Sequence, residues 1–139
     1  MKTLFPYEDK PSTLFKNLKR PIAEVGFWSA KRKRWLVYQM VVDTGADYTI
    51  LPETFAKDLV VDLKSECTPI ETAGVGGEQK VYLLKKKILI RIGNSKRRIP
   101  LGFLAGGNRR YEVPPLLGRY KALDSFGMVF KNFSTTFEE

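Results

Sequence analysis

The sequence contains no histidine and only one cysteine, Cys67. These absences nearly exclude a zinc site and a nucleophile paired with histidine. A lone cysteine cannot form an internal disulfide, which fits a reducing compartment. Every apolar run is broken within about eight residues, well short of a membrane-spanning helix. The sequence therefore predicts a cytoplasmic protein without metal or cofactor, in which acid–base chemistry would come from carboxylates, lysine or tyrosine.

Basic residues outnumber acidic ones by 24 to 15, which gives a net charge of +9. Many of them form four clusters, at 31–34, 85–87, 96–98 and 109–110. Such clusters could attract nucleic acid or another acidic partner. Most of them, however, fall where strands should reverse, and solvated charges are usual there. We therefore expect neither nucleic acid nor a membrane as a partner.

An apolar strand, predicted over Trp35–Val42, leads directly into Asp43-Thr44-Gly45. Both faces of this strand are largely apolar, which is typical of a strand covered on both sides. The glycine can adopt backbone angles that other residues avoid, so the turn can hold a carboxylate at the exit of a buried strand. Asp43 is therefore a candidate catalytic acid.

The rest of the chain shows many strand signals and few helical ones. Apolar residues at helical spacing after Pro52 predict a short helix over 55–63, and Lys86–Ile92 alternates like a half-buried strand. Further strands are predicted at 22–28, on both sides of the glycines within 68–84, at 99–104 and at 127–130, with one or two helical turns at 120–125. We therefore expect a mostly β fold.

Three separated motifs occur in one order: Asp43–Asp47 after the apolar strand, the glycine-rich Ala73–Gly77, and Leu116–Arg119, which reads hydrophobic-hydrophobic-Gly-Arg. In this order they resemble the motifs of the retropepsins, the homodimeric aspartic proteases of retroviruses and their cellular relatives. A lone Asp-Thr-Gly is a weak signal, but three motifs within one domain are a strong one. The resemblance covers nearly the whole chain.

The resemblance implies a single-domain closed β barrel of the acid-protease type, with one or two short helices, over residues 20–130. Residues 1–19 would form an N-terminal arm and residues 131–139 a C-terminal tail. Because aspartic peptidases need two catalytic acids and this chain has one Asp-Thr-Gly, the resemblance also implies a homodimer. Its activity would be hydrolysis of peptide bonds in a peptide or protein substrate, without metal or cofactor.

By the same resemblance, the catalytic loop consists of Asp43, Thr44 and Gly45. Asp43 would face Asp43 of a second subunit, and the two carboxylates would share a proton because both cannot easily ionise. Thr44 matches a residue whose hydroxyl bonds across the dimer axis, and Gly45 lets the two loops approach. The pH optimum of the activity would be less acidic than that of gastric enzymes, because Ala46 stands where many single-chain relatives carry a serine.

Other positions are also implied by the resemblance. Asp47 and Arg119 match residues that pair within one subunit, and Arg20 matches an arginine that reaches the partner's active-site loop. The glycine-rich segment would be a mobile flap over the substrate, formed by Ala73, Gly74, Val75, Gly76 and Gly77. Ala46, Ile50 and Leu116 match positions at the substrate, and their apolar nature implies a preference for hydrophobic side chains beside the cut bond.

Two alternatives remain open at this point. The chain could be a retropepsin-like peptide-binding or scaffold dimer with little turnover, although pairing two acids costs stability that binding alone does not require. It could also be a nucleic-acid-binding protein that uses its basic clusters, although it lacks a recognisable binding motif. Salt dependence of nucleic-acid affinity would identify the latter.

Overall fold

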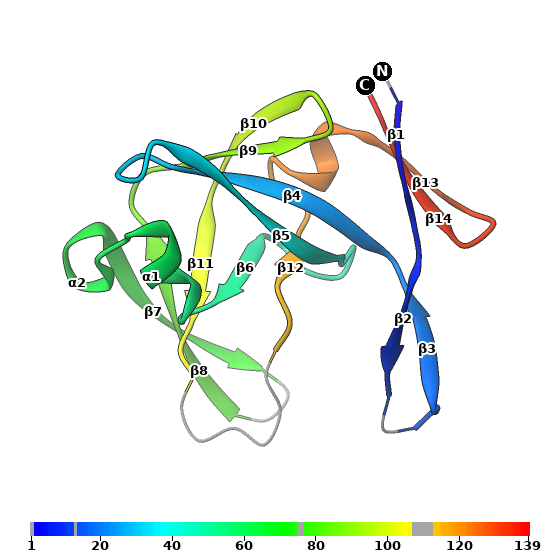
Figure 1. Cartoon of the computed structure of the whole chain (residues 1–139). Helices are drawn as coiled ribbons and strands as arrows, with labels where there is room; N and C mark the ends of the chain where they lie inside the picture. Colours follow the sequence, from blue (N-terminus) through cyan, green and yellow to red (C-terminus); the bar gives the residue numbers. More distant parts are fainter. Residues whose placement is uncertain (1, 13, 75–76, 107–112) are drawn as a thin grey trace.

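The computed structural model describes residues 2–12, 14–74, 77–106 and 113–139, with only the backbone described at 72–74 and 77–78. Strands dominate, as expected for a mostly β fold (Figure 1). The strands are β1 (Lys2–Pro6), β2 (Glu8–Pro11), β3 (Asn17–Arg20), β4 (Ile22–Ser29), β5 (Arg34–Val42), β6 (Thr49–Pro52), β7 (Cys67–Gly74), β8 (Gly77–Leu84), β9 (Ile88–Ile92), β10 (Ser95–Ile99), β11 (Leu101–Leu104), β12 (Leu116–Leu117), β13 (Gly127–Lys131) and β14 (Ser134–Glu138). The helices are α1 (Phe55–Leu59), α2 (Leu63–Glu66) and the single 3-10 turn η1 (Leu123–Ser125).

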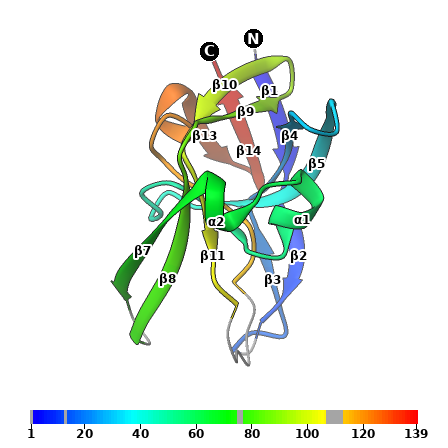
Figure 2. The same ribbon diagram turned by 90° about the vertical axis from the view of Figure 1, so that its left-hand side faces the viewer.

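Nine of these strands form one sheet, in the order β10-β9-β4-β5-β12-β6-β11-β8-β7. The expected closed barrel is wrong, because in the described part of the chain the two end strands β10 and β7 do not pair with each other. Each end strand belongs to a hairpin, and the β7–β8 hairpin projects away from the other strands (Figures 1 and 2). The sheet therefore stays open.

Strand alternation builds the core. In β9, Ile88, Ile90 and Ile92 are buried while the residues between them are partly exposed, as the sequence predicts. The expectation that β5 is covered on both faces is wrong. Its inner face buries Met40 and Val42, but on its outer face Val37 is 55% exposed. Trp35 and Val41 on the same outer face are partly buried, so this face is only partly covered within the chain.

The single helix expected over 55–63 is two short helices. α1 ends where Val60 adopts a left-handed backbone conformation with φ 56°. β-branched residues fit a continuing helix poorly, and Val60 and Val61 follow each other here. Asp62 then caps α2, its carboxylate accepting a hydrogen bond from the backbone N–H of Lys64 at 3.0 Å. None of the described helices is long and apolar enough to cross a membrane.

The two ends of the chain lie side by side. β1 and β13 both pair with β14 in a three-stranded sheet, and β2 and β3 form a separate two-stranded hairpin (Figure 1). Phe137 of β14 is fully buried and packs edge-to-face against Phe5, with ring centroids 5.7 Å apart. Residues 131–139, expected as a polar tail, therefore contribute a strand and a core side chain.

Candidate active site

The loop that follows β5 holds Asp43 through its backbone. β12 lies beside β5 in parallel, with Leu117 opposite Val42, and it also pairs with β6. The N–H of Asp43 donates to the carbonyl oxygen of Leu117 at 3.0 Å. Asp43 therefore stands at the exit of β5, as the sequence predicts, and the hydrogen bond to Leu117 fixes the position of its backbone beside β12.

The carboxylate of Asp43 is oriented by its own turn. Its Oδ1 accepts a hydrogen bond from the N–H of Gly45 at 2.9 Å, and the N–H of Ala46 donates to the Asp43 carbonyl oxygen at 3.2 Å. A Cβ atom on Gly45 would lie 3.3 Å from that same Oδ1, so a glycine gives this turn room. Asp43 is half-buried, whereas Thr44 and Gly45 are exposed. One carboxylate oxygen is thus bound while the side chain still reaches the surface.

A second loop, which follows β12, is joined to the first. The N–H groups of Arg119 and Tyr120 donate to the carbonyl oxygens of Ala46 and Asp47 at 2.9 and 2.8 Å. The N–H of Gly118 donates to Oγ1 of the buried Thr49 at 3.1 Å. Two of the three motifs recognised in the sequence are therefore in direct contact.

Thr49 is missing from the residues that the sequence analysis singles out. The signal for it is weak: a hydroxyl residue immediately before the apolar pair Ile50-Leu51. Its side chain is fully buried, and Gly118 supplies the hydrogen bond that makes such burial tolerable.

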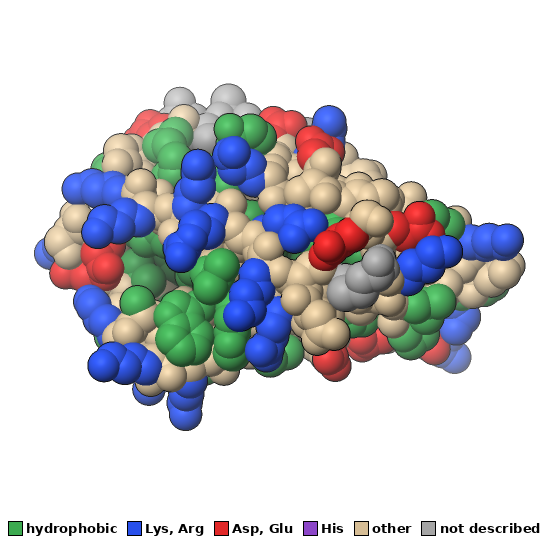
Figure 3. Space-filling view, turned by 90° about the horizontal axis from the view of Figure 1, so that it is seen from above, with side chains coloured by type: hydrophobic (Ala, Val, Ile, Leu, Met, Phe, Trp, Pro, Cys, Tyr) green, Lys and Arg blue, Asp and Glu red, His purple; other side chains and the backbone are tan. Residues whose placement is uncertain are grey.

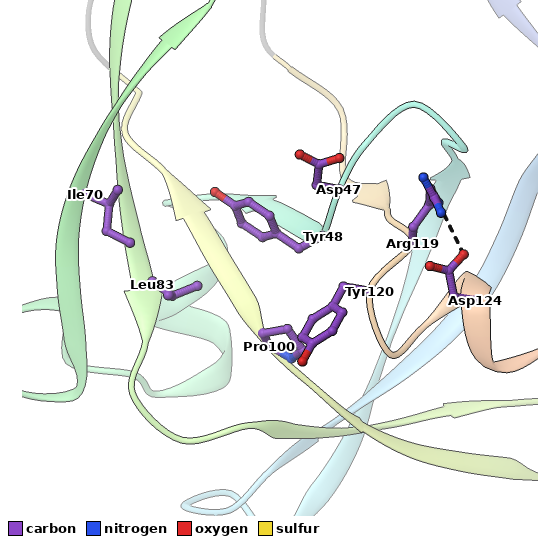
Figure 4. A pocket seen from close by; sticks show the side chains of 8 residues that line it. All are labelled: Asp47, Tyr48, Ile70, Leu83, Pro100, Arg119, Tyr120 and Asp124. Atoms are coloured by element: carbon purple, nitrogen blue, oxygen red, sulfur yellow. Dashed lines mark hydrogen bonds and ion pairs between the residues drawn. The ribbon is translucent and has the colours of Figure 1, made fainter.

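The expected pair between Asp47 and Arg119 is not the one that the structure forms. Nε of Arg119 donates to Oδ1 of Asp124 at 3.2 Å, across the turn that follows Gly118 (Figure 4). Both of these side chains are more than half exposed, so this ion pair stabilises the fold by no more than about 1 kcal/mol. The partners are five positions apart in the sequence, which brings them together at one tight turn.

Arg20 lies close to the end of β5. It ends β3, and the following Pro21 accepts a hydrogen bond from the N–H of Val42 at 2.9 Å. The backbone of Arg20 is thus placed beside the strand that carries Asp43. Its expected contact with a partner subunit stays a prediction.

The glycine-rich segment forms the end of the β7–β8 hairpin. Ala73 and Gly74 lie in β7, and Gly77 begins β8, directly opposite Gly74. Val75 and Gly76 lie outside the described residues. In the sheet, Ile50 of β6 lies opposite Leu116 of β12, and both are partly buried. The expected wall residues are therefore neighbours, and the flap residues sit at the end of a separate hairpin.

A cavity of about 630 Å³ lies beside the two joined loops. Side chains from β7, from β8 and from the neighbouring loops line it (Figure 4): Asp47, Tyr48, Ile70, Leu83, Pro100, Arg119, Tyr120 and Asp124. Burial, together with the nearby Asp47 carboxylate, raises the pKa of Tyr48. Asp43 does not line this cavity. The cavity lies between the candidate catalytic loop and the β7–β8 hairpin.

The described residues contain no group of three His, Cys, Asp or Glu side chains that could hold a metal ion.

The family model described as "Aspartyl protease" matches residues 36–119, more than half of the chain. The chain belongs to this retropepsin-like aspartyl protease family. The matched region runs from β5 to Arg119 and includes all three motifs. A search of curated proteins found no match.

Membership of the aspartyl protease family agrees with the connection between the two loops. The family match begins inside the strand that delivers Asp43 and ends at the arginine whose N–H bonds to the Asp43 loop. The segment also contains the β7–β8 hairpin. The elements that the sequence analysis assigns to catalysis therefore lie within the region that the family shares.

Proposed function

We propose that this chain is an aspartic endopeptidase that acts as a homodimer and hydrolyses peptide bonds with a water molecule activated between two Asp43 carboxylates. The observation that carries the proposal is the position of Asp43: it stands at the exit of β5, with one carboxylate oxygen bound by the N–H of Gly45 and its backbone bonded to Leu117. Family membership supports it. The sequence holds one Asp-Thr-Gly, so the second acid would come from another copy.

The distribution of exposed apolar side chains supports a homodimer. Most of the large hydrophobic residues that are exposed lie in the two terminal segments: Leu4, Leu14, Phe15, Leu18, Val129, Phe130 and Phe133. These segments form the β2–β3 hairpin and the β1-β14-β13 sheet, which lie on one side of the molecule (Figure 1). Exposed apolar residues gathered in this way mark interaction surfaces. A second copy seated there would cover them and bring its own Asp43 loop near.

In the proposed mechanism, two Asp43 side chains share one proton because two adjacent carboxylates cannot easily both ionise. The ionised carboxylate takes a proton from the attacking water, and the protonated one donates a hydrogen bond to the peptide carbonyl oxygen. The water oxygen bonds to the carbonyl carbon, and the proton taken from the water then passes to the amine nitrogen as the peptide C–N bond breaks. The β7–β8 hairpin would close over the substrate and exclude water. Ile50 and Leu116 would favour apolar side chains beside the cut bond.

The proposal is tested by cleavage of a diverse peptide library, read by mass spectrometry from mildly acidic to neutral pH. Wild type, Asp43→Asn and Asp58→Asn are compared at several protein concentrations. Asp58 is an exposed carboxylate on α1 and serves as the matched control. We expect cuts that disappear only in Asp43→Asn, with specific activity rising as dimer forms.

A folded dimer that makes no cuts dependent on Asp43 would contradict peptidase activity and leave a peptide-binding dimer of the same family. Full activity of a verified monomer would contradict the shared dyad instead. Sedimentation at the assay concentrations distinguishes these two failures.

A further inference from the structure

The outer face of β4, β5, β9 and β10 carries both tryptophans of the chain. Trp28 lies opposite Trp35 in the β4–β5 register, and Gly26 lies opposite Val37. Residues that face each other across paired strands point to the same side of a sheet. The two rings are in contact, with centroids 5.4 Å apart. A Cβ atom on Gly26 would lie 3.2 Å from Cε3 of Trp35, so the ring of Trp35 lies across the bare backbone of β4.

Basic side chains continue the same face onto β9 and β10. Arg91 lies opposite Gly26 and Lys96, and Arg98 lies opposite Leu89. The guanidinium of Arg91 and the ammonium of Lys96 stand 4.5 and 5.9 Å from the centroid of the Trp35 ring. We call this surface the tryptophan face; it comprises Gly26, Trp28, Trp35, Val37, Leu89, Arg91, Lys96 and Arg98.

A groove of about 360 Å³ opens along one edge of the tryptophan face. Trp28, Leu89 and Arg98 line it together with apolar residues such as Val60. Three lysines and one carboxylate also line it: Lys31, Lys86, Lys87 and Glu66. A flat aromatic side chain is therefore accessible from a hollow with cations around it. Planar apolar groups with an attached negative charge fit such a site.

The charge on this surface is strongly one-sided. Its basic residues Lys86, Lys87, Arg91, Lys96 and Arg98 form no ion pair with any described carboxylate. The acidic residues near it already have partners: Glu66 pairs with Lys31 at 3.4 Å, and Glu24 accepts a hydrogen bond from Gln39 at 3.2 Å. Viewed from above, Lys and Arg side chains gather over the half of the molecule with the β9–β10 hairpin and the β4–β5 turn (Figure 3).

We propose that the tryptophan face and its groove bind single-stranded nucleic acid. Proteins that bind single strands combine a positively charged groove for the backbone with aromatic side chains on which bases stack. From the sequence we expect no nucleic-acid partner, because each basic cluster reads as a separate turn. Folding changes this, since Lys96–Arg98 lie within β10 rather than at a chain reversal, and β9 and β4 bring them beside both tryptophans.

An acidic protein or an anionic membrane fits this face less well. Carboxylates could pair with the cations but could not stack on the exposed parts of the tryptophan rings. A membrane anchor needs apolar side chains that protrude, but the Trp35 ring lies against the backbone of β4, the Trp28 ring packs against Trp35, and both residues are only partly exposed. A nucleic-acid strand offers phosphates for the five unpaired cations and bases for the rings.

The test uses Asp43→Asn protein and a fluorescein-labelled oligouridine of about 20 nucleotides, longer than the usual site for one single-strand-binding fold. Binding is read by anisotropy and by quenching of tryptophan fluorescence, which reports on this face alone because both tryptophans lie there. With five phosphate contacts, a plot of log affinity against log salt concentration should have a slope of about −3.5. The affinity should then fall roughly 100-fold between 50 and 200 mM salt.

The decisive variant is Lys96→Glu/Arg98→Glu, with Lys57→Glu/Lys80→Glu as control for the same change in net charge. We expect the first pair to lower the salt slope by about 1.4 or more and the second to leave it unchanged. Trp35→Ala should weaken binding by roughly 5- to 100-fold, the usual effect of losing one stacked base.

Equal effects of the two charge reversals would overturn the proposal, and so would binding without tryptophan quenching. The proposal would also be overturned if polyglutamate, or vesicles of phosphatidylserine and phosphatidylcholine, displaced the labelled strand as well as unlabelled oligouridine does. Peptidase activity plays no part in the readout, so the outcome is independent of the proposed function.

Discussion

The substitution Gly118→Ala tests the contact between the two loops of the candidate active site. A Cβ atom at this position would lie 2.3 Å from both the carbonyl carbon and the carbonyl oxygen of Tyr48. Ordinary contact needs at least 3.4 Å. Because the obstacle is backbone, no side-chain rotation can relieve the clash, and the loops must move apart by about 1 Å.

That movement would break three hydrogen bonds at once. The bonds from Arg119 and Tyr120 to the Asp43 loop are worth about 1 kcal/mol each. Losing the bond to Thr49 leaves the buried N–H of residue 118 without an acceptor, at a further cost of about 1 to 3 kcal/mol. We therefore expect Gly118→Ala to lower the free energy of unfolding by roughly 3 to 5 kcal/mol.

The control is Gly127→Ala, because a Cβ atom there would meet nothing closer than 3.5 Å. Its unfolding free energy should stay within about 1 kcal/mol of wild type. Both variants are measured by urea unfolding, followed by tryptophan fluorescence, at one protein concentration. Activity that depends on Asp43 should fall in Gly118→Ala and persist in Gly127→Ala. If the two variants were equally stable and equally active, the argument for tight loop contact would be refuted.

Two further substitutions test buried polar groups. Thr49→Val should lower the free energy of unfolding by about 1 to 3 kcal/mol because the N–H of Gly118 loses its acceptor, whereas Thr49→Ser keeps it; equal urea midpoints for the two variants would contradict this. Burial raises the pKa of Tyr38 from 10.0 to about 12. The folded state therefore favours the neutral phenol, and its contribution to stability should be lost as pH rises from about 10 toward 12. In Tyr38→Phe the free energy of unfolding should fall less steeply over this pH range. The same decline in the variant as in wild type would contradict the role given to the Tyr38 phenol.

The strands that form the centre of the fold could be predicted from the sequence because their apolar residues follow a period of two. This holds for β9, whereas the strand that delivers Asp43 could be predicted because it is apolar on both faces. The strand-like residues on both sides of the glycines also predicted the β7–β8 hairpin correctly. In each case the signal is local: the residues that decide the structure lie within one strand or one turn.

The failures concern elements that depend on distant partners. β14 contains two threonines and a serine, and its sequence resembles a solvated tail. It becomes a strand because β1, from the other end of the chain, and β13 pair with its two edges. Pairing with remote backbone is not encoded in the segment itself.

The candidate site shows the same division. Asp43 and its turn could be predicted because the turn residues are contiguous. The partner of Arg119 could not, because a resemblance transfers the residue and not its neighbours. In this chain Asp124 stands closer to the guanidinium than the expected Asp47 does, and an exposed pair needs little to change its partner.

β5 connects the two proposed activities of this protein. Trp35 stands near its start, and Asp43 follows its end, with eight residue steps between them. A strand rises about 3.3 Å per residue, so the two positions lie roughly 26 Å apart. A nucleic-acid strand on the tryptophan face would therefore leave the Asp43 loop open to a peptide. Because both sites use one central strand, core substitutions such as Met40→Ala should weaken both, whereas surface substitutions at either end should separate them.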